Sequence, residues 1–270
     1  MSGFETHYSA NDIEQRIIAA LRTAGLDPEQ RLTPVELGAL DHFHTGGFRA
    51  SLMLKDRAKI RAGDVVLDIG AGLAGAARML AASPGCKVTC IEMSSDYCVA
   101  AKLLNRLTGL EDRVEVLQGS ALDMPFADAS FDTVWMQNVG MNIADKPTLY
   151  REIRRVLKPG GRFAFQEMIS GSGEARYFSL PWATSSADKL LISAAEMQAL
   201  LTNAGFSADY FEDLSDAPLP PPPDGTPDST PQAPLSLSVY VSNLALKAEN
   251  ATRSVREGHI RLFRGVFLAS

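Results

Sequence analysis

Short apolar runs alternate with amphipathic stretches along most of the chain. The apolar runs are typical of buried strands, and the stretches between them repeat apolar residues every three to four positions, as one face of a helix does. We expect strands over residues 64–69, 87–92, 113–118, 131–137, 162–168 and 208–213, and helices over 73–83, 95–108, 146–157 and 193–204. This alternation predicts an α/β fold, with a parallel sheet covered by helices on both faces.

Three helices are expected before the first strand. They cover residues 11–24, a short stretch that begins at the capping box Thr33-Pro34-Val35-Glu36, and residues 48–60. We therefore divide the chain into an N-terminal helical cap, residues 1–61, and a second domain, residues 62–270.

A proline-rich stretch interrupts the second domain. Residues 216–236 hold eight of the fifteen prolines, which predicts an exposed, extended insertion. A helix near residues 244–255 and a strand at 259–268 follow it. Two elements are too few for a core of their own, so we expect them to complete the first sheet.

A glycine turn follows the first predicted strand. Gly70, Gly72 and Gly75 fit the pattern G-x-G-x-x-G, and Glu92 lies 22 residues after Gly70, at the end of the second strand. This spacing is typical of a nucleotide-cofactor site in which the second acid binds a ribose. The structural alternative is a tight turn beside ordinary strand-end acids.

Asp68 distinguishes between the cofactors that such a turn can hold. A carboxylate here would repel the pyrophosphate of NAD by about 4 kcal/mol at a distance of ~4 Å. S-adenosylmethionine (SAM) has no phosphate and carries an ammonium and a sulfonium, which Asp68 would attract. The turn therefore favours SAM over NAD.

Composition narrows the class of protein further. The 270 residues include 46% hydrophobic and 21% charged residues with a net charge of −6, which is ordinary for a globular protein. The lysines and arginines are scattered, so we expect no nucleic-acid partner. The sequence has no signal-peptide pattern and no membrane-length apolar run, so we expect no membrane partner and a cytoplasmic location. Cys86, Cys90 and Cys98 are interpreted as small core residues.

Five motifs, in this order, resemble those of the class I SAM-dependent methyltransferases. They are Val66-Leu67-Asp68-Ile69-Gly70-Ala71-Gly72, Glu92-Met93, residues 119–126, residues 130–134 and Leu157-Lys158-Pro159-Gly160-Gly161. Residues 41–47 and 137–143 are similar to the branch that includes glycine, sarcosine and dimethylglycine N-methyltransferases. The resemblance implies a Rossmann-like seven-stranded mixed sheet whose last strand is antiparallel.

The resemblance also implies a role for each matching residue. Asp68 would bind the methionine ammonium, and Gly70, Ala71 and Gly72 would line the methionine backbone. Glu92 would hold the ribose, Met93 would pack on the adenine, and the Ala121 amide would contact an adenine ring nitrogen. Gln137 would lie near the reactive methyl. Two positions depart from the family pattern. The family often has glycine where this chain has Ala74. An alanine is tolerable there only if it is already helical, in which case Gly75 supplies the close helix packing. The family often has aspartate where this chain has Ser120. Serine is a weaker hydrogen-bond acceptor, so it would hold the adenine less firmly.

Residues outside these motifs are candidates for the acceptor side. Methyl transfer needs alignment above all, and a hydroxyl acceptor also needs a base. His44, His42 and Gln137 are the catalytic candidates, although the histidines can equally be turn residues bonded to backbone. Asn138 and Asn142 either orient the acceptor or cap the helix near Asp145, and Trp182 either contacts the acceptor or packs in the core. A metal site is not expected.

The sequence thus predicts a SAM-dependent methyltransferase that methylates nitrogen or oxygen of a small molecule. The alternatives are carbon methylation, a non-methylating reaction on the same scaffold, a SAM-binding partner protein without catalysis, and an NAD-dependent reductase. The acceptor and the oligomeric state stay open.

Overall fold

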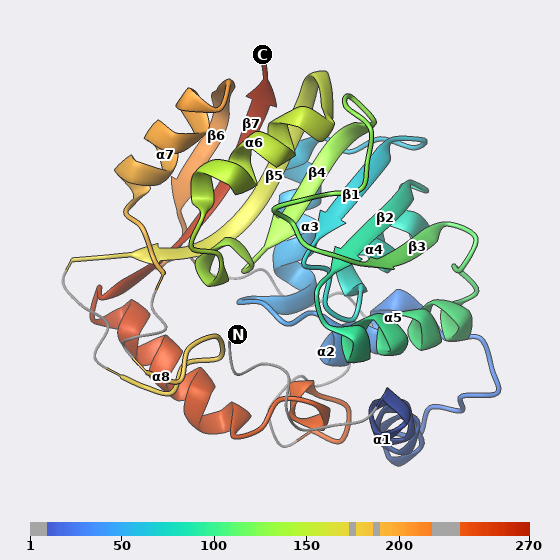
Figure 1. Cartoon of the computed structure of the whole chain (residues 1–270). Coiled ribbons are helices and arrows are strands. Elements are labelled where there is room, and N and C mark those ends of the chain that lie inside the picture. The colour runs from blue at the N-terminus through green and yellow to red at the C-terminus, as the bar shows by residue number, and fades with distance from the viewer. Residues whose placement is uncertain (1–9, 173–176, 186–189, 218–232) are drawn as a thin grey trace.

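The computed structural model describes residues 10–172, 177–185, 190–217 and 233–270, which form one seven-stranded sheet (Figure 1). The strands are β1 (Val65–Ile69), β2 (Lys87–Glu92), β3 (Val114–Gln118), β4 (Phe131–Gln137), β5 (Leu157–Ser170), β6 (Phe206–Asp213) and β7 (Ile260–Ala269). Their order is β3-β2-β1-β4-β5-β7-β6, and β7 is antiparallel to both of its neighbours. The expected mixed sheet with an antiparallel last strand is confirmed.

Helices cover both faces of this sheet. They are α1 (Ala10–Thr23), α2 (Pro34–Asp41), α3 (Gly47–Ala58), α4 (Gly75–Ala82), α5 (Ser95–Thr108), α6 (Lys146–Val156), α7 (Ala194–Asn203) and α8 (Leu244–Arg256), with short 3₁₀ turns η1 (Gly140–Asn142) and η3 (Leu237–Val239). One face packs against α3, α4 and α5, and the other packs against α6 and α7. The predicted elements are found close to their expected bounds, and the three cysteines are buried and free as expected.

The N-terminal helices are built into the core. α1 packs on α5, α2 packs on α4, and α3 lies against β5 and β7. The expected capping box of α2 is present, with Thr33 and Glu36 each accepting the other's backbone N–H. These contacts bring the segment between α2 and α3 directly over the sheet.

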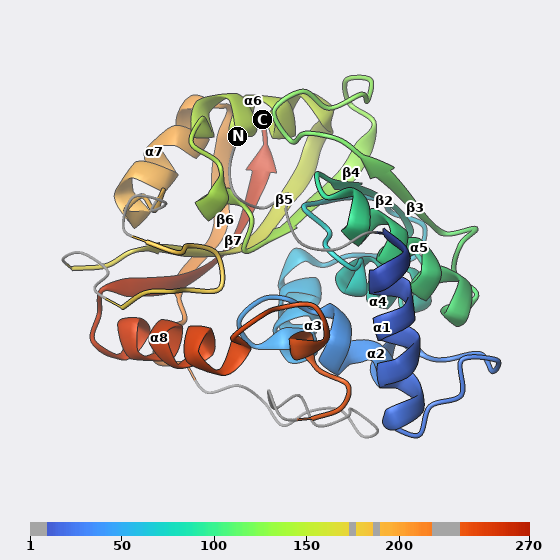
Figure 2. The same cartoon turned by 60° about the horizontal axis from the view of Figure 1, so that its bottom comes forward.

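The C-terminal part returns to the same sheet, as expected. β7 inserts between β5 and β6, and α8 crosses the side on which the parallel strands end (Figures 1 and 2). The described residues include no helix long and apolar enough to span a bilayer.

Two expectations about these segments need correction. β5 begins at Leu157, earlier than residue 162, because Leu157 already pairs with Phe131 before a bulge in the ladder. Most of the predicted insertion, residues 218–232, lies outside the described residues. Among its described residues Asp216, Ala217 and Pro234 are exposed as expected, but Leu235 and Ser236 are buried, and Leu235 packs among side chains of α1 and α5.

Candidate functional site

A cavity of about 1890 Å³ lies along the carboxyl ends of the parallel strands. In open α/β sheets this is the edge at which ligands bind. Every residue that the sequence places in the site lines this cavity: His42, His44, Asp68, Gly70, Ala71, Gly72, Glu92, Met93, Ser120, Ala121, Gln137, Asn138, Asn142 and Trp182. The structure therefore brings the predicted residues together, and their individual roles stay predictions.

The glycine turn between β1 and α4 depends on its first two glycines. Gly70 and Gly72 have φ angles of +64° and +55°, a region that glycine enters without steric cost. A Cβ at Gly70 would lie 2.5 Å from a methyl of Val139, so the backbone passes too close to that residue for any side chain. At this turn the backbone itself lines the cavity.

Ala74 does not have the helical conformation expected of it. Its φ of +60° is left-handed, and its buried methyl packs in the core on the α4 side of the sheet. Gly75 does supply close packing, because a Cβ there would lie 2.5 Å from the Asp41 carbonyl oxygen at the end of α2. The chain therefore enters α4 through an alanine in a strained, left-handed conformation, next to a tight contact between α2 and α4.

Two acids face each other across this turn. Asp68 is only 3% exposed, and burial and the nearby Glu92 carboxylate raise its pKa to about 8. Glu92 accepts the N–H of Gly72 and the N–H of Ser94, both at 2.9 Å, on different oxygens. A desolvated acid of raised pKa beside a second acid attracts a cation and repels a phosphate. This arrangement fits the ammonium and sulfonium of SAM.

Three residues border the region expected for adenine. Met93 is 69% exposed and lines the cavity, so its thioether side chain is accessible to a ligand ring. Ser120 accepts the Leu122 N–H through its hydroxyl and keeps its own proton to donate. Ala121 follows it with a partly buried side chain.

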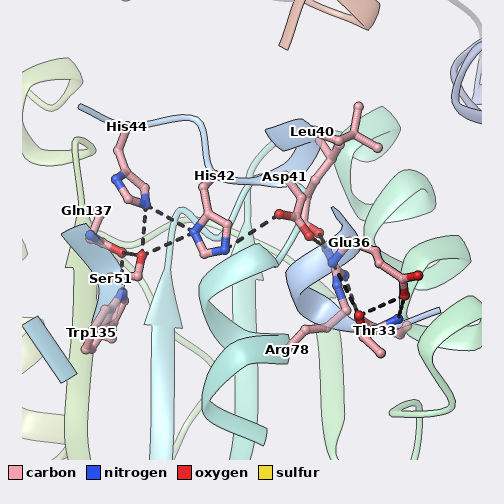
Figure 3. Close-up of polar contacts among 12 residues, drawn as sticks. Thr33, Glu36, Leu40, Asp41, His42, His44, Ser51, Arg78, Trp135 and Gln137 are labelled. Carbon is pink, nitrogen blue, oxygen red and sulfur yellow. Dashed lines mark hydrogen bonds and ion pairs between the residues drawn. The ribbon is translucent and has the colours of Figure 1, made fainter. Parts of the chain in front are cut away.

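The orientation of the Gln137 amide is determined by its neighbours (Figure 3). The Trp135 indole nitrogen lies 2.9 Å from Gln137 Oε1, and since an indole N–H only donates, that atom must be the oxygen. The Ser51 hydroxyl donates to the same oxygen, also at 2.9 Å. Gln137 Nε2 is left buried with no partner in the described part of the chain.

Ser51 also joins both histidines (Figure 3). Its Oγ lies 3.2 Å from His42 Nδ1 and 3.1 Å from His44 Nε2. Burial lowers the pKa of both imidazoles to about 3, aided by Arg78 at His42 and by His42 and Arg264 at His44. Both rings are therefore neutral near pH 7. The alternative of backbone-bonded turn histidines accounts for only one contact, from His44 Nδ1 to the Thr45 carbonyl at 3.5 Å.

Behind the histidines lies a buried ion pair that the sequence analysis did not find. Arg78 on α4 donates to Asp41 at 2.7 Å, with both side chains fully buried. The other Asp41 oxygen lies 3.6 Å from His42 Nε2. Burial raises the pKa of Asp41 to about 6, although Arg78 opposes the shift. This pair connects the glycine-turn helix to the histidine segment, and no local motif marks it.

A row of polar side chains across the sheet anchors the same segment and was also missed. Gln166 on β5 is paired in register with Gln137 on one side and Arg264 on the other. Gln166 donates to the Thr45 carbonyl, and Arg264 donates to Gln166 and to the Ala50 carbonyl. The available signal was a glutamine inside an otherwise apolar strand, and an arginine at the matching level of β7.

The loop after β4 is held by Glu167, another missed residue. Its carboxylate accepts backbone N–H groups of Val139, Gly140 and Met141 at 3.0, 2.8 and 3.3 Å. Burial raises the pKa of Glu167 to about 7, against these bonds and the charge of Lys146. These bonds hold in place the loop that carries two of the predicted acceptor residues, Asn138 and Asn142.

The predicted acceptor residues lie on this loop and opposite it. The helix-capping alternative for Asn138 and Asn142 is wrong, because Asp145 itself accepts the Thr148 N–H at the start of α6. Asn138 has a φ of +54° and an unpartnered Oδ1, considering the described residues only. Trp182 is buried against Met168 and Leu262, yet its indole nitrogen finds no partner there. Across the described ranges, no three His, Cys, Asp or Glu side chains are grouped as metal ligands.

Comparisons with known proteins agree with this geometry. Residues 67–165 match the family model described as Methyltransferase domain. The chain is 35% identical over 151 residues to the glycine/sarcosine/dimethylglycine N-methyltransferase of Actinopolyspora halophila, covering 56% of this chain and 27% of that protein. It is 38% identical over 133 residues to the sterol 24-C-methyltransferase of Eremothecium gossypii, covering 47% and 36%. The chain thus spans well under two thirds of these relatives.

A solved structure extends the likeness of the fold. The geranyl diphosphate C-methyltransferase of Streptomyces coelicolor A3(2) superposes with a TM-score of 0.64 at 20% identity, covering 82% of this chain and 78% of that one. At this identity the likeness concerns the fold.

Proposed function

Since the chain carries a class I SAM-dependent methyltransferase domain, we propose that it transfers a methyl group from SAM to nitrogen or oxygen of a small-molecule acceptor. The observation that carries the proposal is that the buried Asp68, the Glu92 held by two backbone N–H groups, Gln137 and His44 all line one cavity. The absence of nucleic-acid and membrane partners and the cytoplasmic location stay predictions from the sequence.

Residues of the glycine turn, of the end of β2 and of the segment after β3 would hold the cofactor. Asp68 would bind the ammonium, Gly70, Ala71 and Gly72 would line the methionine backbone, Glu92 would accept both ribose hydroxyls, and Met93, Ser120 and Ala121 would border the adenine. When bound, SAM supplies a methyl group on a positively charged sulfur that leaves as a neutral thioether. Asp68 would bind in its ionised form, losing its proton as the cation arrives.

Gln137 and His44 would act on the acceptor. The locked Gln137 Nε2 can donate to one lone pair of a hydroxyl oxygen while the second lone pair attacks the methyl carbon. A neutral amine has only one lone pair and could not do both, which favours oxygen over nitrogen. Because Ser51 donates its only proton to Gln137, His44 Nε2–H donates to Ser51. The lone pair of His44 Nδ1 would then take the proton from the methylated, positively charged oxygen, a much stronger acid than imidazolium.

The test is a screen with methyl-labelled SAM. The full chain is incubated with phenols, alcohols, amines and a cell extract, and the labelled product is analysed for the atom that carries the methyl. We expect the label on oxygen or nitrogen, and none with Asp68→Ala. Label on carbon would overturn the acceptor atom but not the cofactor. SAM binding without any product would favour a partner protein, and NADH binding without SAM binding would overturn the proposal.

A further inference from the structure

The cavity continues well beyond the cofactor residues, into a region that is almost entirely apolar. We define this apolar chamber by the side chains that line its far end: Met141, Met168, Leu180, Trp182, Ala248, Ala251, Val255 and Leu262. They come from η1, β5, the segment before residue 185, α8 and β7. Four of them, Met141, Met168, Leu180 and Leu262, belong with Trp182 to one buried cluster that is separate from the two main sheet cores.

Polar residues also line the cavity beside the apolar chamber, and all of them are half-exposed or exposed: Thr184, Ser215, Asp216, Lys247, Thr252 and Arg256. Within the chamber wall the indole nitrogen of Trp182 has no partner among the described residues. A buried N–H without a partner is unfavourable, so a ligand oxygen beside it would be stabilising. The wall suits a molecule that is mostly apolar and carries few polar atoms.

The size of the cavity points the same way. Sites for one small ligand usually measure about 300–1,000 Å³, and this cavity is about 1890 Å³. Once a cofactor lies over the glycine turn, the remaining space suits a second molecule of similar size. An acceptor as small as an amino acid would leave the apolar wall in contact with water, without the gain that burial of apolar surface gives.

We propose that the methyl acceptor is a mostly apolar molecule, larger than an amino acid, whose reacting hydroxyl lies beside Gln137 and whose apolar body lies in the apolar chamber. This inference rests on the proposed function, because it assumes that the glycine-turn side holds SAM. Met141, which lines the chamber, lies in the Glu167-held loop that follows Gln137, and both residues line the same cavity, so one extended molecule can contact both.

The experiment measures an apolar probe on the full chain saturated with S-adenosylhomocysteine. N-phenyl-1-naphthylamine is uncharged and fluoresces strongly in apolar surroundings, so its titration reports the chamber directly. Ala251→Trp fills the chamber from α8. Ala245→Trp places the same side chain on the same helix at an exposed position that does not line the cavity, and is the matched control.

We expect saturable probe binding to the wild type and Ala245→Trp, and at least tenfold weaker binding to Ala251→Trp, with equal S-adenosylhomocysteine affinity in all three. No probe binding to the cofactor-saturated protein, or unchanged binding to Ala251→Trp, would overturn the inference. If Ala251→Trp loses cofactor affinity through misfolding, Ala248→Trp, one turn earlier, takes its place under the same criteria. Failure of the wild type to bind S-adenosylhomocysteine would instead overturn the proposed function.

Discussion

The two sides of the cavity are built in different ways. The cofactor side consists of three short segments, residues 68–75, 92–94 and 120–121, which lie at or just after the carboxyl ends of β1, β2 and β3. The acceptor side gathers residues from both ends of the chain: Arg264 on β7 bonds to the Ala50 carbonyl across 214 positions of sequence. Local geometry therefore determines the first side, whereas tertiary contacts determine the second.

The ion pair between Arg78 and Asp41 connects the two sides, and its loss should have the largest effect. Arg78→Met leaves the Asp41 carboxylate buried without its cation, which should lower the free energy of unfolding by about 3–5 kcal/mol. Urea denaturation measures this change. Arg113→Met, at an exposed arginine, should stay close to wild type. A loss below about 1 kcal/mol for Arg78→Met would show that the two sides are stabilised independently.

Asp68→Asn should affect the cofactor side alone. Removing a buried charge opposite the ammonium should weaken SAM binding by about 100-fold, or ~3 kcal/mol, as measured by calorimetry. Probe binding in the apolar chamber should not change. Asp112→Asn, at an exposed aspartate, is the matched control. Wild-type SAM affinity in Asp68→Asn would remove Asp68 from the cofactor site.

The raised pKa of Asp68 makes cofactor binding depend on pH. Below a pKa of about 8 the free protein holds a proton on Asp68, which a bound cation displaces. SAM affinity should therefore rise by about tenfold per pH unit towards pH 8 and then level off. Calorimetry in buffers of different ionisation enthalpy should detect the released proton. Equal proton release from Asp68→Asn would assign it to another group.

Ser51→Ala should affect the acceptor side alone. It removes one of the two bonds that orient the Gln137 amide and the bridge between the histidines, so kcat/KM for an acceptor found in the screen should fall about tenfold. The Kd for SAM should change by less than about twofold. Ser254→Ala, at an equally buried serine bonded to the Asn250 carbonyl, provides the control. A matching loss of SAM affinity would mean that the two sides cannot be separated here.

The smallest effect concerns the strained turn. Ala74→Gly removes about 1–2 kcal/mol of left-handed strain but loses a buried methyl and adds chain entropy, so stability should change by less than about 1 kcal/mol. Gly72→Ala meets no atom within 4 Å and should cost only the strain itself. Urea denaturation compares both variants. A loss above about 2 kcal/mol in Ala74→Gly would mean that packing dominates at this position.

The same difference between the sides explains what could be predicted. Asp68, the glycine turn and Glu92 are close in sequence and have fixed spacing, so a local pattern was sufficient to place them. Arg78 and Ser51 were missed because a lone arginine or serine on a helix has no distinguishing sequence context. Their importance arises from partners 37 and 86 positions away, Asp41 and Gln137. Ala74 was misassigned because its left-handed conformation is one that alanine enters only at a steric cost, and no local pattern marks it.

The two backbone bonds to Glu92 lower the entropic cost of binding a ligand at this carboxylate. Both carboxylate oxygens are held before any ligand arrives, by Gly72 and Ser94. The side chain has therefore already lost its rotamer freedom during folding, and the proposed recognition of a ribose by Glu92 would require no further ordering there. Each oxygen still has a lone pair available, so the receptor is rigid and unsaturated at the same time. Such preorganisation favours discrimination between sugars that differ by a single hydroxyl.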